Sequence, residues 1–409
     1  MLGATRTDTN SLHVTARLNE IGIAVRAKAV VGDSTDDLAS ILGSALSRSD
    51  LIVLTGGLGP TDDDVTRDAV ARVLGRPLHE DAAILERLRA RFAARGLDMP
   101  PLNRRQAMVP ENAEVLHNPH GTAPGLWIEH AGHILVLLPG PPGELKPMVD
   151  VLIRERLVLR AEGMRLLTRI VRVAGRTESH VEMAAQPLYE RWREKSRSIE
   201  VTILAAPGTI DLHLTVRVRD VALGAAVLDA AVGDLREVFA DDLYSANGQP
   251  MEEVLGGMLR EGRHTIAVAE SCTGGLLSSR LTDVPGSSVY LDRAVVAYSN
   301  EAKIAWLGVG ADLIAAHGAV SEPVAEAMAA GIRARADTTI GVAVTGIAGP
   351  GGGTPEKPVG TVAIAVEGPW GRSVRMRRFS GHREQVKWHA SSAAMDDVRR
   401  AILRAGRAG

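Results

Sequence analysis

Apolar, strand-like runs alternate with amphipathic helical segments at both ends of the chain, and this alternation constrains the fold more than any other feature. In the first part we predict helices over 11–23 and 36–46 and strands over 24–33 and 49–57. The stretch 133–144 is predicted to be another buried strand that runs into a Pro/Gly loop. Alternation of this kind favours a parallel sheet with helices on both faces. In such sheets ligands bind beyond the carboxyl ends of the strands.

The chain has 409 residues, which is too long for one ordinary domain. A change of pattern near residue 160 indicates three regions. We assign the fold class α/β, with two α/β sandwich domains of mainly parallel sheets (1–162 and 246–409) joined by a small α+β module (163–245). The module follows a βαββα order with a hairpin through Pro207 and Gly208. We expect it to link or dimerise the protein, and we expect 244–250 to be a linker.

Composition excludes several classes of protein. The formal charge is -2 with scattered Lys and Arg, so we expect no nucleic-acid partner. A single cysteine excludes an intrachain disulfide and a cysteine-based structural zinc site. There is neither a signal peptide nor an apolar run near the roughly 18 residues that a membrane helix needs. We therefore expect a cytoplasmic protein with no membrane partner.

The stretch "AESCTGG" (269–275) places two nucleophiles, Ser271 and Cys272, at a strand-to-helix turn. A nucleophile needs a base and an oxyanion site. The backbone N–H groups of Thr273, Gly274 and Gly275 are candidates for the oxyanion site. Residue chemistry alone leaves both nucleophiles open, because a cysteine beside a helix start can be strongly activated whereas a buried one is inert.

The stretch "AYSNEAK" (297–303) is the best source of the base, since a predicted strand ends there and a helix begins. Lys303 can act as a base if burial lowers its pKa, and Tyr298 can relay the proton. The alternative is that Lys303 is a surface residue of the helix and Tyr298 a half-buried strand residue.

A long glycine loop, "TGIAGPGGGTPEKPVG" (345–360), follows another buried strand. Its backbone can wrap a phosphate or a ribose, although such composition is also common in flexible surface loops. A phosphate anchor is predicted either at a glycine loop or at Arg383.

The N-terminal counterpart is "TGGLGPTDDDVT" (55–66), which sets glycines and three aspartates at the end of a buried strand. Glycines let the backbone approach a phosphate, and carboxylates beside it can hold Mg²⁺. The alternative is a helix cap made by Thr61 and Asp64.

These motifs resemble the CinA family (competence/damage-inducible protein A). "TGGLGPTDDDVT", "NRRQA", Asn118, "GTAPG" and "LPGPPGE" are similar to its molybdopterin-binding-like N-terminal domain. "AESCTGG", "YSNEAK", "HGAVSEPV" and "TGIAGPGGGTPEKPVGTV" resemble its PncC-type nicotinamide-mononucleotide deamidase domain, over roughly 250–405. The family usually opens with a strand and a "GTELLLG"-like turn. This chain begins "MLGATRTDTNS", so we expect the first strand of the N-terminal sheet to be missing.

The resemblance implies that nicotinamide mononucleotide is converted to nicotinic acid mononucleotide and ammonia, with no cofactor. Ser271 would be the nucleophile, activated by Tyr298 and Lys303. The residues expected to bind the nucleotide are Thr273, Gly274, Gly275, Asn300, Thr345, Gly346, Gly349 and Arg383.

For the N-terminal domain the resemblance implies a metal-dependent ADP-ribose pyrophosphatase, with a divalent metal such as Mg²⁺ at Asp63 and Asp64. Its nucleotide or phosphate loop would comprise Gly56, Gly57, Gly59, Thr61 and Asn118. A homodimer and small-molecule nucleotide substrates are expected. The alternatives to deamidation are this pyrophosphatase activity and a non-catalytic nucleotide-binding role in competence or the response to DNA damage.

Overall fold

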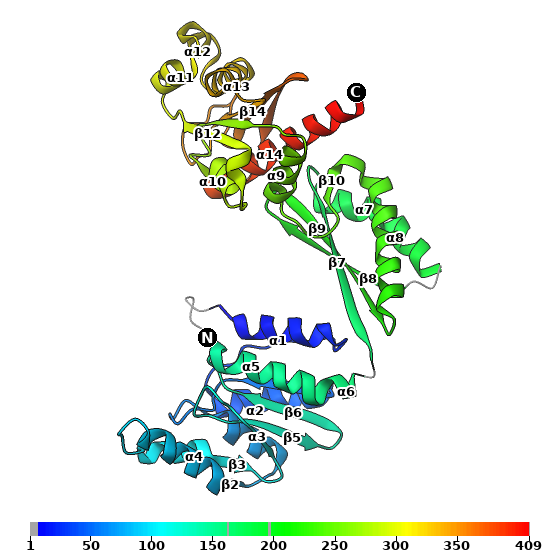
Figure 1. Cartoon of the computed structure of the whole chain (residues 1–409), viewed down its shortest axis with the longest axis vertical. Coiled ribbons are helices and arrows are strands. Elements are labelled where there is room, and N and C mark those ends of the chain that lie inside the picture. Colours follow the sequence, from blue (N-terminus) through cyan, green and yellow to red (C-terminus); the bar gives the residue numbers. More distant parts are fainter. Residues whose placement is uncertain (1–6, 162, 195–197, 409) are drawn as a thin grey trace. The chain divides into compact units, whose positions relative to one another are not determined.

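The computed structural model describes residues 7–161, 163–194 and 198–408 (Figure 1). The chain forms two compact units. The first comprises Met1–Leu167 with Arg217–Gly224, and the second Thr168–Val216 with Ala225–Gly409. Of the helices in the described ranges, none combines the length and apolarity needed to cross a bilayer.

The first unit is built on a four-stranded sheet in the order β1-β6-β5-β4. Strand β1 (Leu51–Thr55) runs parallel to β6 (His133–Leu138), and the β6–β5 and β5–β4 pairs are antiparallel, with β5 at Gly125–His130 and β4 at Glu114–Leu116. The remaining strands β2 (Leu78–Glu80) and β3 (Met108–Pro110) form a small ladder of their own.

Alternate residues of the central strands face two separate cores. Leu135 and Leu137 of β6 pack with helices α2 (Thr35–Leu46), α3 (Thr66–Leu74) and α4 (Ala82–Ala93). Val136 and Leu138 pack with α1 (Thr9–Glu20) and α5 (Pro142–Leu152) on the other face. A π-helical turn (Ile153–Leu157) and α6 (Val158–Arg160) complete the unit. The expected layers of helix, sheet and helix are therefore present.

The strand predicted over 24–33 is wrong, because this segment forms neither strand nor helix. It is mostly exposed, and Val30 is 48 % accessible. The neighbouring strand β1 is at the sheet edge, and no other strand of the described chain pairs with its outer side. A strand-forming sequence without a neighbour to bond leaves its backbone groups to water. The opening residues 1–6, on which the expectation of a missing first strand rests, lie outside the described residues.

The small module has the predicted βαββα order. Its elements are β7 (Arg165–Val173), α7 (Glu178–Glu194), β8 (Ile199–Ala206), β9 (Thr209–Val218) and α8 (Val221–Phe239). Pro207 and Gly208 form the hairpin turn, as predicted. The linker prediction over 244–250 is wrong at its start, because Tyr244 and Ser245 are buried in strand β10 (Leu243–Ser245), which pairs with β7.

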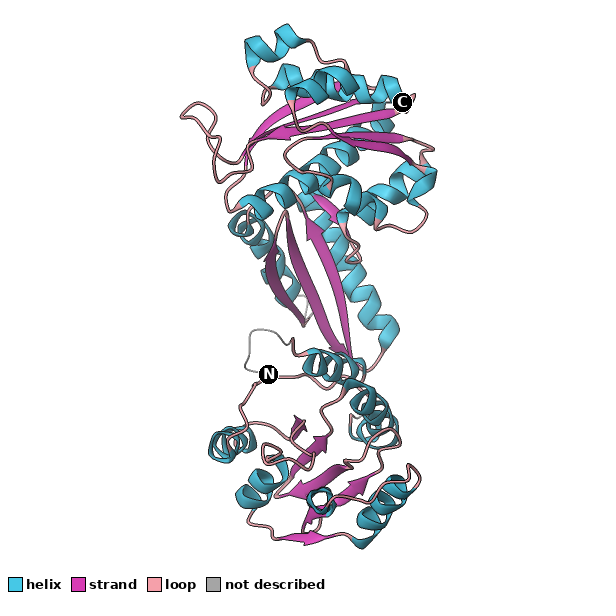
Figure 2. Ribbon diagram, turned by 90° about the vertical axis from the view of Figure 1, so that its left-hand side faces the viewer, coloured by secondary structure: helices cyan, strands magenta, loops and turns pink. Residues whose placement is uncertain are grey.

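The C-terminal part of the second unit is a five-stranded sheet in the order β12-β11-β13-β14-β15 (Figure 2). Strands β12 (Leu291–Val296), β11 (Ile266–Glu270) and β13 (Ile340–Gly346) are parallel, and β14 (Thr361–Gly368) and β15 (Gly371–Arg378) are antiparallel additions. Strand β15 and helix α12 (Ala311–His317) were not predicted from the sequence.

In this sheet too, alternate residues of a strand face two separate cores. Ile266 and Val268 of β11 pack with α9 (Met251–Glu261), α10 (Leu276–Thr282) and α14 (Arg383–Ala408). Ala267 and Ala269 face α11 (Asn300–Leu307) and α13 (Glu322–Ala336) on the other side. Because β11, β12 and β13 are parallel, the loops after all three lie at the same edge of the sheet.

Candidate active site

Ser271 follows β11 directly and is 7 % exposed. Its N–H donates to the carbonyl of Val344 on β13, at 2.9 Å. The next residues turn sharply, with Gly274 and Gly275 at φ values of +61° and +93°. Side chains rarely adopt this left-handed conformation, which explains the glycine pair. The turn from Ser271 to Gly275, named here the nucleophile turn, is thus fixed by the neighbouring strand and by its own glycines.

Glu270, which sequence reasoning missed, holds this turn from beneath. It is fully buried, and its Oε2 accepts from the N–H groups of Gly275 and Leu277 at 3.0 and 3.1 Å. Its Oε1 accepts from both the N–H and the hydroxyl of Ser278, each at 2.8 Å. Four donors from the first turn of α10 compensate the burial of this carboxylate. The sequence shows an acidic residue directly after the apolar run 264–269, but it does not show that this residue is buried.

Lys303 reaches Ser271 from the connection after β12. It is 1 % exposed, and its Nζ lies 3.2 Å from Ser271 Oγ. The same Nζ donates to the carbonyls of Ala297 and Tyr298, at 3.1 and 3.2 Å. The alternative that Lys303 is a surface residue of the helix is therefore wrong.

The environment of Lys303 suits a base. Burial lowers the pKa of its ammonium, and the nearby Cys272 and Glu301 oppose this shift. A neutral amine has two hydrogens and one lone pair. As an ammonium, Nζ donates to Ser271 Oγ as well as to the two carbonyls. When it is neutral, the two carbonyls can accept its two hydrogens, which leaves the lone pair for the Ser271 hydroxyl. This arrangement can remove the proton of Ser271 as it attacks.

Cys272 is buried behind the turn, and desolvation raises the pKa of its thiol to about 12. At neutral pH it is a protonated thiol, which is a weak nucleophile. Its Sγ would lie 3.0 Å from a Cβ added at Gly346, so it packs against the end of β13. Of the two nucleophiles that the sequence left open, Ser271 is the one placed beside a base.

The N–H groups predicted to form an oxyanion site are partly occupied. The N–H of Gly274 donates to Ser271 O, and that of Gly275 to Glu270. In the described part of the chain, the N–H groups of Cys272 and Thr273 have no acceptor. The buried hydroxyl of Thr273 also lacks a partner there. The donors free to meet a ligand therefore lie earlier in the turn than expected.

Arg383, at the start of α14, joins two of the predicted loops. It donates to the carbonyl of Gly349 at 2.8 Å and to the hydroxyl of Tyr298 at 3.1 Å. Tyr298 itself is 60 % exposed, and in the described structure its hydroxyl forms no hydrogen bond with Ser271. Lys387, one turn further along α14 and missed from sequence, has its Nζ 3.6 Å from a Cβ added at Gly274.

The other predicted nucleotide-binding residues have mixed surroundings. Asn300 is exposed at the first position of α11. Thr345 is buried, and its hydroxyl donates to the carbonyl of Ala319 at 2.9 Å. Gly346 is packed so closely that an added Cβ would lie within 3.0 Å of Val362, Thr361 and Cys272. Thr345 and Gly346 therefore mainly determine the shape of the sheet edge at the end of β13.

The N-terminal loop is held by its own side chains. Asp64 Oδ2 accepts from both the N–H and the hydroxyl of Thr61, at 3.0 and 2.6 Å. The helix cap named as the alternative is wrong, because α3 begins only at Thr66 and has no side-chain cap. Cβ atoms at Gly57 and Gly59 would collide with Thr66 and Asp64, and Gly56 has a φ of +93°. Buried Arg67, missed from sequence, donates to the carbonyls of Leu58 and Gly59.

Asn118 uses its whole amide to shape a loop. Its Nδ2 donates to Ala123 O and Glu144 Oε2, and its Oδ1 accepts from the N–H groups of His120 and Gly121. Within the described ranges no three His, Cys, Asp or Glu side chains gather as a metal site. Mg²⁺ is commonly held by one or two carboxylates with waters and phosphates. The metal assigned to Asp63 and Asp64 therefore stays a prediction.

Comparison with known proteins agrees with the family resemblance of both the N-terminal and the C-terminal part of the chain. The family model CinA, described as "CinA C-terminal domain", matches residues 248–402. The model described as "Probable molybdopterin binding domain" matches residues 1–158. A "CinA-like protein" of Solibacter usitatus is 42 % identical over 402 residues, covering 98 % of this chain and 96 % of the relative. One of Koribacter versatilis is 43 % identical over 402 residues, covering 97 % and 96 %.

Among solved structures, the competence/damage inducible protein CihA of Agrobacterium tumefaciens is 36 % identical, with a TM-score of 0.36. The match covers 39 % of this chain and 99 % of that one. The full-length relatives carry the assignment: the chain belongs to the CinA family.

Proposed function

We propose that this protein hydrolyses the carboxamide of nicotinamide mononucleotide, releasing ammonia and nicotinic acid mononucleotide. The observation that carries the proposal is the 3.2 Å approach of Lys303 Nζ to Ser271 Oγ in a buried setting. A serine beside a lysine of lowered pKa is an activated nucleophile. The substrate class is the one that the resemblance of the motifs to the PncC-type domain implies.

In the proposed reaction Ser271 Oγ attacks the carboxamide carbon while Lys303 takes its proton. The free N–H groups of Cys272 and Thr273 stabilise the negative charge on the carboxamide oxygen. The Lys303 ammonium then gives its proton to the departing nitrogen, and ammonia leaves an ester on Ser271. Water, deprotonated by Lys303, hydrolyses that ester. No step needs a metal, since nucleophile and base are both side chains.

Arg383 and the 345–353 loop support binding of the nucleotide. The guanidinium of Arg383 joins the loop at Gly349 to Tyr298 after β12. A cation at this place can pair with the 5′-phosphate. Tyr298, by its exposed ring, is available to contact the substrate.

The test is ammonia release from nicotinamide mononucleotide by the purified full chain, with Ser271→Ala and Lys303→Met beside it. We expect each variant to lose roughly 10³-fold or more in kcat while remaining folded. Cys272→Ala is the matched control, since it alters the same turn without removing nucleophile or base. If the folded wild type releases no ammonia, the proposal is wrong, and hydrolysis of ADP-ribose with Mg²⁺ becomes the next activity to assay.

A further inference from the structure

We propose that the tip of the β8–β9 hairpin, Pro207 and Gly208, positions the nucleophile turn by holding Trp388 on α14 and, through it, Arg280 on α10. Pro207, Gly208, Trp388 and Arg280 are then positioning residues for a reaction whose nucleophile is in the next domain. The inference rests on the proposed function for its kinetic readout, and a second readout is independent of activity.

The hairpin tip makes a backbone contact with α14. Trp388 Nε1 donates to the carbonyl of Pro207 at 2.9 Å. Gly208 has a φ of +84°, and a Cβ added there would lie 2.9 Å from both Cβ and Oγ of Ser392. Glycine is therefore required at this tip for two reasons, the backbone conformation and the close approach of the helix.

The residues that receive the hairpin also hold Arg280. The Arg280 guanidinium lies 4.2 Å from the centroid of the Trp388 ring. Its Nη1 donates to the hydroxyls of Ser391 and Ser392, both at 2.7 Å, and its Nη2 to Glu252 at 3.0 Å. Arg280 is 5 % exposed, so this buried cation depends on these partners.

Arg280 belongs to α10, the helix that begins directly after the nucleophile turn. The first turn of α10 is tied to Glu270, the residue before Ser271. A cavity of about 190 Å³ lies between the hairpin and α10 and is lined by Pro207, Gly208, Arg280 and Trp388. The Nε of Arg280 is buried there without a partner in the described structure. The cavity leaves Arg280 space to move when the hairpin shifts, and α10 would move with it.

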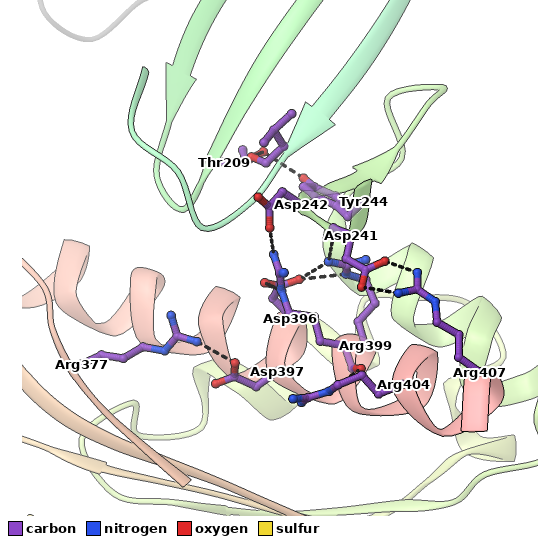
Figure 3. Close-up of polar contacts among 12 residues, drawn as sticks. Thr209, Asp241, Asp242, Tyr244, Arg377, Asp396, Asp397, Arg399, Arg404 and Arg407 are labelled. Atoms are coloured by element: carbon purple, nitrogen blue, oxygen red, sulfur yellow. Dashed lines mark hydrogen bonds and ion pairs between the residues drawn. The ribbon is translucent and has the colours of Figure 1, made fainter. Parts of the chain in front are cut away.

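Helix α14 makes the second connection. Arg383 and Lys387 lie on the active-site side of this helix, and Trp388 and Ser392 receive the hairpin within the next turns. Further along, Arg399 and Arg407 reach Asp241, beyond the end of α8, and Figure 3 shows both side chains directed at it. Thr209, next to the tip, accepts a hydrogen bond from Tyr244 in β10. The module thus holds α14 at two places, and the hairpin is the one beside the active site.

The kinetic test compares Gly208→Ala and Trp388→Phe with Gly233→Ala, all in the full chain with nicotinamide mononucleotide. Gly233 lies in α8 of the same module, and nothing lies within 4 Å of an added Cβ there. Trp388→Phe keeps a ring over Arg280 and removes the bond to Pro207. We expect roughly tenfold lower kcat for Gly208→Ala, a smaller loss for Trp388→Phe, and a KM within about twofold of wild type for both. Gly233→Ala keeps the wild-type kcat.

The activity-independent test uses Cys272, the only cysteine of the chain, which is buried in the nucleophile turn. A thiol reagent labels it only when the turn opens. We expect Gly208→Ala to label roughly tenfold faster than wild type, at a rate that is flat at low urea and so reports local opening.

The two tests separate the two proposals. Faster labelling in a protein without deamidase activity supports the hairpin contact and rejects the proposed reaction. Wild-type labelling of Gly208→Ala, whatever its kcat, overturns the positioning role. Equal acceleration by Gly233→Ala overturns it as well, since any disturbance of the module would then suffice.

Discussion

Lys303 and Ser271 are 32 positions apart in sequence, yet Lys303 Nζ lies 3.2 Å from Ser271 Oγ. The parallel pairing of β11 with β12 brings them together, because Ser271 follows one strand and Lys303 lies in the helix after the other. The contact is buried, so it depends little on the salt concentration of the medium.

The rate of deamidation should depend on pH through Lys303. Only its neutral form can accept the proton of Ser271. Burial lowers its pKa from the ordinary value of 10.5, so the neutral form is present at a lower pH than for an exposed lysine. We expect kcat to rise with pH through this lowered pKa and then level off before pH 10.5 is reached. A pH–rate profile measures it.

Lys303→Arg is the control for this profile. It keeps a long cationic side chain, but a guanidinium does not lose its proton in proteins. The variant should be inactive at every pH. A rising limb that persists in Lys303→Arg would assign the titration to another group.

Cys272→Ala should leave the kcat within about threefold of wild type. The thiol has a pKa of about 12, so almost none of it is thiolate at neutral pH. Its loss leaves a small cavity against Gly346, which we expect to lower the free energy of unfolding by about 1 kcal/mol. Ammonia release and urea unfolding measure the two quantities. A loss of activity as deep as that of Ser271→Ala would make the thiol the nucleophile.

The sequence predicted the parts of the site that follow strands. Ser271, Lys303 and the loop at Gly349 each lie just beyond an apolar run, and the end of such a run is visible in sequence. Their convergence followed from parallel pairing, which the strand and helix alternation indicates. The βαββα order of the module was predictable because its strands and helices are likewise visible in sequence as apolar runs and amphipathic segments.

The sequence could not show which side chains and backbone groups form hydrogen bonds with one another. Glu270 looks like the last residue of a strand, and its role becomes visible only when the N–H groups of Leu277 and Ser278 turn back to it. Trp388 and Pro207 are 181 positions apart, and no periodicity relates them. The strand predicted over 24–33 failed because strand composition is not enough without a neighbouring strand.

Glu270→Gln should destabilise the protein by about 2 kcal/mol and lower kcat. The carboxylate accepts four hydrogen bonds from the first turn of α10. An amide keeps only one oxygen, and its NH₂ group would face N–H donors. The free energy of urea unfolding measures the change.

Glu301→Gln is the matched control for this loss, because Glu301 is an exposed carboxylate in α11. It should change the free energy of unfolding by less than about 0.5 kcal/mol. If Glu270→Gln is equally mild, the four hydrogen bonds do not hold the turn.

Gly346→Ala should lower kcat by roughly tenfold or more, because the new methyl group has no space. Its Cβ would lie 2.7 Å from Val362 Cγ2, 2.8 Å from the Thr361 carbonyl and 3.0 Å from Cys272 Sγ. The carbonyl is backbone in β14 and cannot rotate away, so the strain passes to Cys272, the neighbour of Ser271. Gly257→Ala, in α9 of the same domain, adds a methyl group with nothing within 4 Å and should keep the wild-type kcat. Steady-state ammonia release from both variants decides the matter: equal rates would mean that the end of β13 does not set the position of the nucleophile.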